Sequence, residues 1–137
     1  MRILIDTHYV IWAALHPETM EPWAREMMID LNNEVIVSAA SLYEISLKVR
    51  KGKLPEAVPF ESDLVKNIES LGYSVLPLEP EVIVRAARFE DLHTDPFDRM
   101  IAAHAIQHNL PVLSIDDKLD AFGVRRIRNP AQRRGDR

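Results

Sequence analysis

Four acidic residues of this sequence lie next to predicted strand ends or in predicted helices, which are positions that suit a binding site. Asp6 and Asp116 each close an apolar run of residues. Asp98 lies in the first turn of a predicted helix, and Glu44 lies in a helix that follows a strand-like segment. Because ligands of open α/β sheets bind outside the carboxyl ends of the strands, acids at these positions can meet in one pocket.

Carboxylates that share a pocket repel one another by ~1–4 kcal/mol per pair at ~4 Å, depending on the dielectric. A divalent cation relieves this repulsion, and hard oxygen ligands favour Mg²⁺ or Mn²⁺. We therefore expect these acids, if they meet in one pocket, to bind such an ion. Such a site activates a bound water as the nucleophile, so the pattern is typical of a metal-dependent hydrolase.

Two of these acids have a simpler interpretation as helix caps. Asp6 precedes a predicted helix, where Asp is a favourable N-cap residue. Asp95 and Asp98 flank Pro96, which suits the first position of a helix, and both acids favour the positive end of that helix. We expect Asp95 to be the cap and Asp98 to be the metal ligand.

The other two acids also have structural alternatives. Glu44 lies four residues before Lys48, in the orientation that favours an ion pair along one helix. Asp116 and Asp117 together are an ordinary helix-start signal. Here we expect Asp117 to be the cap and Asp116 to be the ligand.

The histidines give a weaker signal than the acids. His104 and His108 have the i,i+4 spacing of a zinc site, but no Glu follows the first of them as in the His-Glu-x-x-His motif. A structural role is therefore the favoured interpretation of this pair. His8 is positioned to hydrogen-bond near Asp6, and no chemistry is assigned to it.

Composition narrows the classes of protein further. The chain has 137 residues, which fits one domain, and it has no cysteine, which excludes thiolate chemistry. Its sequence contains neither a phosphate-binding loop nor a nucleophile elbow. The longest apolar stretch is far too short to cross a membrane, so we expect a cytoplasmic protein. The net charge is −4, but residues 48–53 and 125–137 are basic, which is compatible with local contacts to phosphates.

Short strands alternate with helices throughout the chain, which predicts one α/β domain with a short parallel central sheet and helices on both faces. The predicted strands are residues 2–5, 34–37, 73–77, 111–115 and 124–127. The predicted helices are residues 7–15, 19–31, 39–51, 61–71, 80–90, 96–108 and 117–122, with a loop over 55–59. We place the domain at residues 1–129 and expect residues 130–137 to be a basic, disordered tail.

Several segments, taken together, resemble the PIN-domain ribonucleases, and most closely the VapC-like toxins of bacterial and archaeal toxin–antitoxin pairs. They span nearly the whole chain in the order of that family: Leu4–His8, Val37–Ile45, Lys48–Leu54, His93–Ala102 and Leu113–Asp116. The resemblance implies a PIN-like fold, usually dimeric, and an RNA substrate whose phosphodiester bonds are hydrolysed. It also implies a small antitoxin partner whose C-terminal segment blocks the site.

The family pattern carries the catalytic acids onto positions of this chain residue by residue. The resemblance assigns them to Asp6, Glu44, Asp98 and Asp116. With this assignment we expect Asp6, Asp98 and Asp116, helped by Glu44, to hold one or two Mg²⁺ or Mn²⁺ ions.

Three further residues are expected to support these acids, two of them from the family pattern. Thr7 is the usual small hydroxyl beside the first acid, and Ser114 stands where the family more often has Thr. Arg99 is a candidate for binding flanking phosphates of the RNA, and its alternative role is to brace Asp95 or Glu90.

Two other functions remain open from the sequence. One is a structure-specific DNA nuclease of PIN-like type, for which 137 residues leave little room for DNA-binding insertions. The other is a non-catalytic binding module or co-repressor, which would be expected to have lost at least one of the four acids. Cleavage of single-stranded RNA against flap DNA distinguishes the ribonuclease from the DNA nuclease. Metal binding without turnover on any substrate would favour the non-catalytic module.

Overall fold

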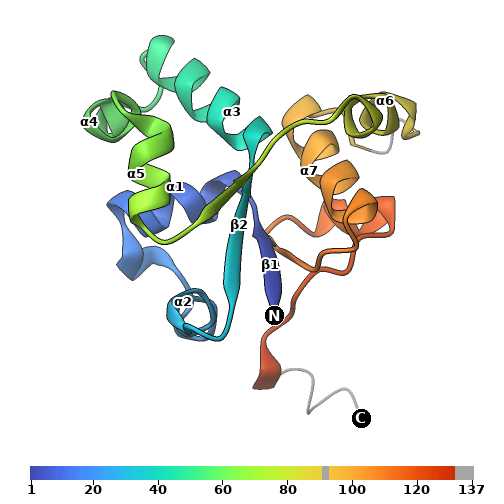
Figure 1. The fold of residues 1–137 in the computed structure, drawn as a ribbon, viewed down its shortest axis with the longest axis horizontal. Coiled ribbons are helices and arrows are strands. Elements are labelled where there is room, and N and C mark those ends of the chain that lie inside the picture. Colours follow the sequence, from blue (N-terminus) through green and yellow to red (C-terminus); the bar gives the residue numbers. More distant parts are fainter. Residues whose placement is uncertain (91–92, 132–137) are drawn as a thin grey trace.

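The computed structural model describes residues 1–90 and 93–131 of the chain. Its sheet has four parallel strands in the order β3-β2-β1-β4. Their bounds are β1 Arg2–Ile5, β2 Glu34–Ser38, β3 Ser74–Leu76 and β4 Val112–Leu113. Figure 1 shows β1 and β2 side by side at the centre of the molecule, with helices on either side. The predicted short parallel sheet flanked by helices is confirmed.

Seven α-helices and three 3-10 segments connect the described strands. The α-helices are α1 Thr7–Leu15, α2 Pro22–Ile29, α3 Ala39–Arg50, α4 Val58–Glu61, α5 Leu64–Ser70, α6 Pro80–Arg88 and α7 Pro96–Gln107. The 3-10 segments are η1 Pro17–Thr19, η2 Pro55–Ala57 and η3 Asp117–Phe122. Within the described ranges, no helix has the length and apolar character needed to cross a bilayer.

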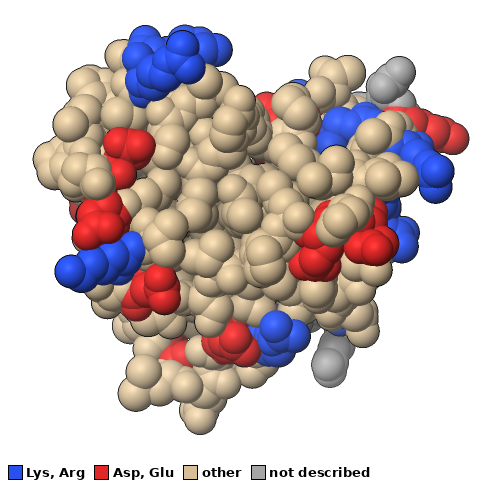
Figure 2. Space-filling view, turned by 45° about the horizontal axis from the view of Figure 1, so that its top comes forward, with Lys and Arg blue, Asp and Glu red and all other residues tan. Residues whose placement is uncertain are grey.

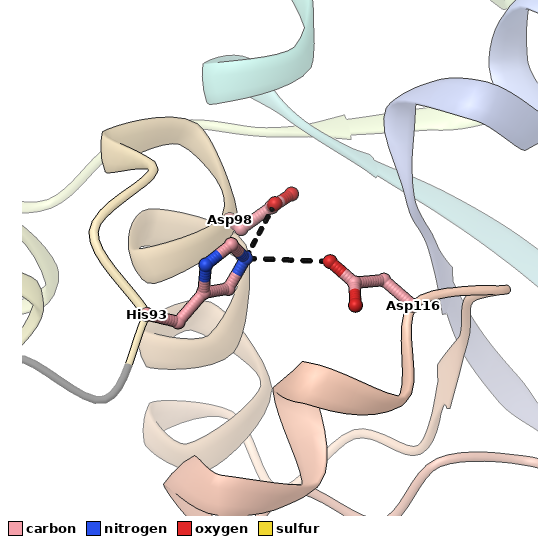
Figure 3. Close-up of side chains that lie close together, drawn as sticks. All are labelled: His93, Asp98 and Asp116. Carbon is pink, nitrogen blue, oxygen red and sulfur yellow. Dashed lines mark hydrogen bonds and ion pairs between the residues drawn. The ribbon is translucent and has the colours of Figure 1, made fainter.

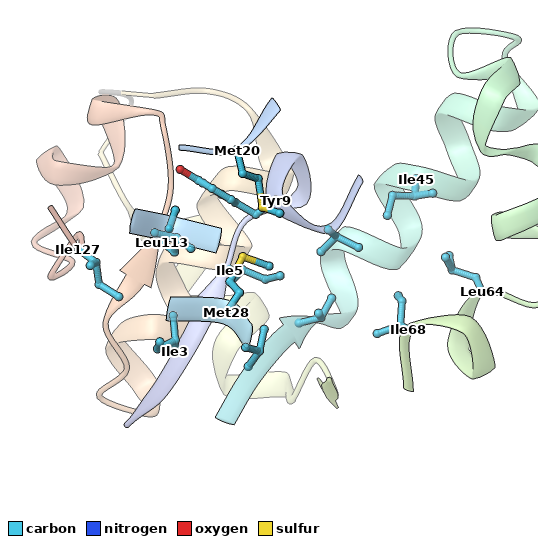
Figure 4. Close-up of a cluster of buried hydrophobic side chains, with 14 residues drawn as sticks. Ile3, Ile5, Tyr9, Met20, Met28, Ile45, Leu64, Ile68, Leu113 and Ile127 are labelled. Carbon is cyan, nitrogen blue, oxygen red and sulfur yellow. The ribbon is translucent and has the colours of Figure 1, made fainter. Parts of the chain in front are cut away.

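Because side chains alternate along the strands, each face of the sheet has its own hydrophobic core. On β1, Ile3 and Ile5 pack with α1, α2 and α5 on one face, as Figure 4 shows, whereas Leu4 points to the opposite face. That second face is covered by α7 and η3 through Ile101 and Leu119. Because side chains of a strand alternate between its two faces, this short central strand is buried on both sides.

Polar side chains start the helices at the carboxyl edge of the sheet. The Ser38 hydroxyl accepts a hydrogen bond from Ala40 N at 3.1 Å and caps α3. Asp95 accepts from the amides of Phe97 and Asp98 at 2.9 and 3.1 Å, so it caps α7 as predicted. These caps satisfy amides that the first turn of a helix leaves without partners.

The structure corrects several boundaries. Residues 55–59, predicted to be a loop, instead begin η2 and α4, because proline is tolerated in the first turn of a helix. The strand predicted at 124–127 is reduced to a single parallel bridge between Val112 and Arg126. Of the predicted tail, residues 132–137 lie outside the described part of the chain, so the domain boundary stays a prediction.

Candidate metal centre at the carboxyl edge of the sheet

The order of the strands creates a crevice between β1 and β4. From β1 the chain crosses to β2 and β3 on one side, and it then returns to place β4 on the other side of β1. Neighbouring strands whose connections run in opposite directions form a topological switch point, which is where open α/β sheets bind ligands. Asp6 follows β1 directly, and Ser114 follows β4.

Asp6 is both a helix cap and a buried carboxylate. Its Oδ1 accepts a hydrogen bond from Tyr9 N at 3.2 Å, so it caps α1. Its Oδ2 accepts from the Ser114 hydroxyl at 2.6 Å, and His8 Nδ1 lies 4.0 Å from the same oxygen. Burial raises the pKa of Asp6, and the hydrogen bond from Ser114 partly opposes that rise.

Ser114 joins Asp6 to Asp116 across the switch point. The Ser114 hydroxyl donates to Asp6 and accepts from Asp116 N at 3.0 Å. Asp116 also accepts from Lys118 N at 3.0 Å and is the N-cap of η3. The prediction that Asp117 would be the cap is therefore wrong, because Asp117 is already the first residue of η3 and the residue before it is the cap.

Asp98 and Asp116 meet around the imidazole of His93 (Figure 3). His93 Nε2 lies 2.9 Å from Asp98 Oδ2 and 3.3 Å from Asp116 Oδ2. One ligand atom from each of the three residues lies within 4.8 Å of the other two. No role was predicted for His93, although it opens the segment His93–Ala102 that carries the family resemblance.

The carboxyl group of Asp98 is held in unfavourable surroundings. Burial raises its pKa to about 6, with further contributions from the negative charges of Asp95 and Glu44. The His93 hydrogen bond opposes this rise without cancelling it. A metal-free carboxylate that is destabilised in this way favours a cation, because a nearby positive charge stabilises the ionised form.

Glu44 has one satisfied and one unsatisfied oxygen. Its Oε2 pairs with Lys48 Nζ at 3.0 Å, which is the ion pair that the spacing predicts. Its Oε1 is fully buried and has no hydrogen-bond partner among the described residues. Thr7 holds this region together, since its hydroxyl hydrogen-bonds with that of Ser41 at 2.9 Å and so ties α1 to α3.

Arg99 is buried and binds the main chain at the end of α6. Its Nε donates to the carbonyl of Ala86 at 3.0 Å, and its Nη1 donates to the carbonyls of Glu90 and His93 at 3.1 and 3.0 Å. Its Nη2 also donates to the carbonyl of Phe89. This placement favours the bracing role over the phosphate-binding role, with Glu90 contacted through its carbonyl.

The pair of histidines on α7 has structural partners. His104 is fully buried, with Nδ1 2.8 Å from the Ser38 hydroxyl and Nε2 2.9 Å from the Pro77 carbonyl. His108 Nε2 instead lies 2.7 Å from Glu79 Oε2. These contacts tie α7 to the loops at the ends of β2 and β3, which agrees with the structural interpretation.

The four predicted acids thus lie at one edge of the sheet, with different degrees of contact. Asp98 and Asp116 share the His93 ring, and Glu44 is close enough to raise the pKa of Asp98. Asp6 is joined to Asp116 through Ser114 rather than by a direct bond. The donor set of carboxylate oxygens, one of them buried without a partner, suits a hard divalent cation.

Comparison with known proteins identifies the family. The PIN domain model matches residues 3–124, which includes every residue of the site. The chain belongs to the PIN-domain family. This PIN domain is 26% identical over 121 residues to ribonuclease VapC22 of Mycobacterium tuberculosis strain ATCC 25618 / H37Rv, covering 85% of this chain and 88% of that protein.

Solved structures have the same fold. The crystal structure of FitAcB from Neisseria gonorrhoeae superposes with a TM-score of 0.61 at 26% identity, covering 94% of this PIN domain chain and 98% of that chain. VapBC2 from Rickettsia felis, crystallised with a DNA fragment from its promoter, superposes with a TM-score of 0.61 at 18% identity. That match covers 85% of this chain and 88% of the other, and at this identity it supports the fold alone.

Proposed function

We propose that this PIN domain is a metal-dependent endoribonuclease that acts as the toxin of a toxin–antitoxin pair. The observation that carries the proposal is the meeting of Asp98 and Asp116 at the switch point, beside the unpaired buried oxygen of Glu44. The match to the relative named as a ribonuclease covers most of both chains, and this relative supports RNA as the substrate.

The residues present fit a divalent cation. Asp98 and Asp116 supply partly exposed oxygens. The pKa of Asp98 is raised chiefly by burial and further by the charges of Asp95 and Glu44, and a cation would stabilise its ionised form. Asp6 contributes a buried carboxylate whose Ser114 hydrogen bond fixes its orientation. In this proposal Asp6, Asp98 and Asp116 hold Mg²⁺ or Mn²⁺.

The acids and Ser114 then have the following roles around the bound ion. A bound Mg²⁺ or Mn²⁺ would lower the pKa of water and neutralise charge on the scissile phosphate. Glu44 or Asp116 would orient the attacking water, since Glu44 Oε1 has no hydrogen-bond partner among the described residues and the Asp116 side chain is partly exposed. Ser114 fixes the positions of Asp6 and Asp116 relative to each other, because its hydroxyl hydrogen-bonds to both residues.

Basic side chains provide a surface for the RNA backbone. Figure 2 shows Lys and Arg side chains gathered over the C-terminal end of α3, away from the acidic groups on the same face. Arg50, Lys51 and Lys53 in this region are exposed. Since single-stranded regions expose the bases and the backbone together, we propose single-stranded RNA or an RNA loop as the substrate.

The partners follow from the same family comparison. FitAcB, at 26% identity, is among the solved structures that this fold resembles, and the relative at 26% identity is named ribonuclease VapC22. We propose a small antitoxin that covers the carboxyl edge, a homodimer of the PIN domain, and a cytoplasmic location.

Cleavage assays test the proposed activity. The purified protein, freed from any bound partner, is incubated with single-stranded RNA or flap DNA in Mn²⁺ or Mg²⁺. We expect cleavage of the RNA, loss of cleavage in Asp98→Asn and Asp116→Asn, and retention in Asp117→Asn, which changes a neighbouring exposed acid. Cleavage of the flap DNA alone would favour the DNA nuclease, and metal binding without cleavage of either substrate would favour the non-catalytic module.

A further inference from the structure

We propose that His93 is a metal ligand of this site, so that the centre has mixed nitrogen and oxygen donors and prefers Mn²⁺ to Mg²⁺. The inference rests on the metal site of the proposed function, but it does not depend on RNA being the substrate. It assigns a task to a side chain that the four-acid pattern does not include.

The first support is the spacing of the three donor atoms. His93 Nε2 lies 2.9 Å from Asp98 Oδ2 and 3.3 Å from Asp116 Oδ2. Adjacent ligands of an octahedral ion lie ~3.0 Å apart when each metal–ligand bond is ~2.1 Å long. His93 Nε2 therefore has the spacing of a neighbouring ligand to each of the two carboxylate oxygens, and the three ligand atoms lie within 4.8 Å of one another.

The second support is the way in which His93 is held. Its ring is nearly parallel to that of Phe122, with centroids 6.2 Å apart and an interplanar angle of 20°. Its main-chain carbonyl accepts from Arg99 Nη1 at 3.0 Å. The side chain is only 12% exposed, and in Figure 3 its Nε2 is directed at both carboxylates. Such positioning is what a preorganised ligand needs.

Nitrogen ligation has a predictable effect on metal choice. Carboxylates bind Mg²⁺ and Mn²⁺ alike, whereas imidazole binds ions further along the first transition series more strongly. Ligation requires neutral imidazole with Nε2 unprotonated, so the ring proton would be on Nδ1. The site should then bind Mn²⁺ more tightly than Mg²⁺, and replacement of His93 should remove most of that preference.

Pulsed electron paramagnetic resonance of Mn²⁺ bound to the full-length protein tests the ligand directly. We expect modulation from a directly coordinated ¹⁴N nucleus in the wild type and its loss in His93→Gln. The control is His108→Gln, which removes another partly buried histidine that pairs with an acid and should leave the signal unchanged. Calorimetry in parallel should show the Mn²⁺ affinity of His93→Gln lowered by ~10-fold or more, with a smaller change for Mg²⁺.

The outcomes separate this inference from the proposed function. Saturable Mn²⁺ binding without a nitrogen signal in the wild type would overturn the role of His93, while RNA cleavage by the same sample would leave the ribonuclease standing. Absence of Mn²⁺ binding would overturn the metal role of His93 together with the metal site. A nitrogen signal without cleavage of RNA would support His93 as a ligand and count against the proposed activity.

Discussion

Replacing Asp98 by Asn should leave the metal-free protein equally stable or more stable at neutral pH. Asp98 has a pKa of about 6 in the folded protein, against an ordinary value of 3.8, chiefly because of burial. The folded state therefore binds more protons than the unfolded chain between these values, and its stability falls as the pH rises through that window. Asn carries no charge, so the variant avoids this loss.

The size of the effect follows from the same values. The difference between about 6 and 3.8 corresponds to ~3 kcal/mol at full effect. The side chain is 25% exposed, so solvent screening reduces this to ~1–2 kcal/mol. The lost acid in the first turn of α7 costs ~0.3–1 kcal/mol. We expect a net effect between no change and a gain of ~2 kcal/mol above about pH 6, and any gain disappears as the pH falls toward 4.

Urea unfolding in EDTA, followed by circular dichroism at pH 7.5 and pH 4.5, measures this difference in free energy. Asp117→Asn is the matched control, since it removes an exposed acid from the neighbouring η3. A loss of more than ~1 kcal/mol in Asp98→Asn at pH 7.5 would refute the reasoning. Asp98 would then be a stabilising helix-start acid rather than a carboxylate held for a cation.

Three other substitutions test the supports of the site. Ser114→Ala removes the hydroxyl between Asp6 and Asp116 and should lower the free energy of unfolding in urea by ~1–3 kcal/mol. Ser114→Thr keeps a hydroxyl and should stay close to wild type. Equal losses of stability in the two variants would contradict a role for the hydroxyl. Arg99→Lys cannot reproduce the hydrogen bonds to the carbonyls after α6 and should cost ~2–3 kcal/mol; an unchanged unfolding midpoint would argue against the bracing role. His104→Ala should cost ~2–4 kcal/mol and leave Mn²⁺ affinity unchanged in calorimetry, because this buried ring joins elements rather than binding metal.

The regular elements that build the carboxyl edge were predictable from local patterns. The apolar run before Asp6 predicted β1, and the Asp95–Pro96 pair predicted the start of α7, because cap and proline preferences act within one turn. The short sheet flanked by helices on both faces followed from the alternation of such segments. These features depend on neighbours in sequence, so they can be recognised without coordinates.

Features that depend on distant contacts were not predictable in the same way. His93 lies in a loop without periodicity, and its position depends on Phe122 and Arg99, which lie on other elements. For Arg99 the sequence left phosphate binding and bracing open, because nothing nearby in the sequence shows that main-chain carbonyls in and after α6 will surround it. The hydroxyl of Ser114 was noted from the family pattern, but its bond to Asp6 spans 108 residues.

The central claim is that distant acids of this PIN domain form one divalent-metal site, and calorimetric titration tests it most directly. Mn²⁺ is titrated into the wild type, freed from any bound partner, and into Asp6→Asn and Asp98→Asn. The account predicts saturable binding in the wild type that both variants lose, since Asp6 and Asp98 lie on different elements but serve the same ion. Absence of binding in the wild type, or unchanged binding in both variants, would contradict it and leave these acids as helix caps.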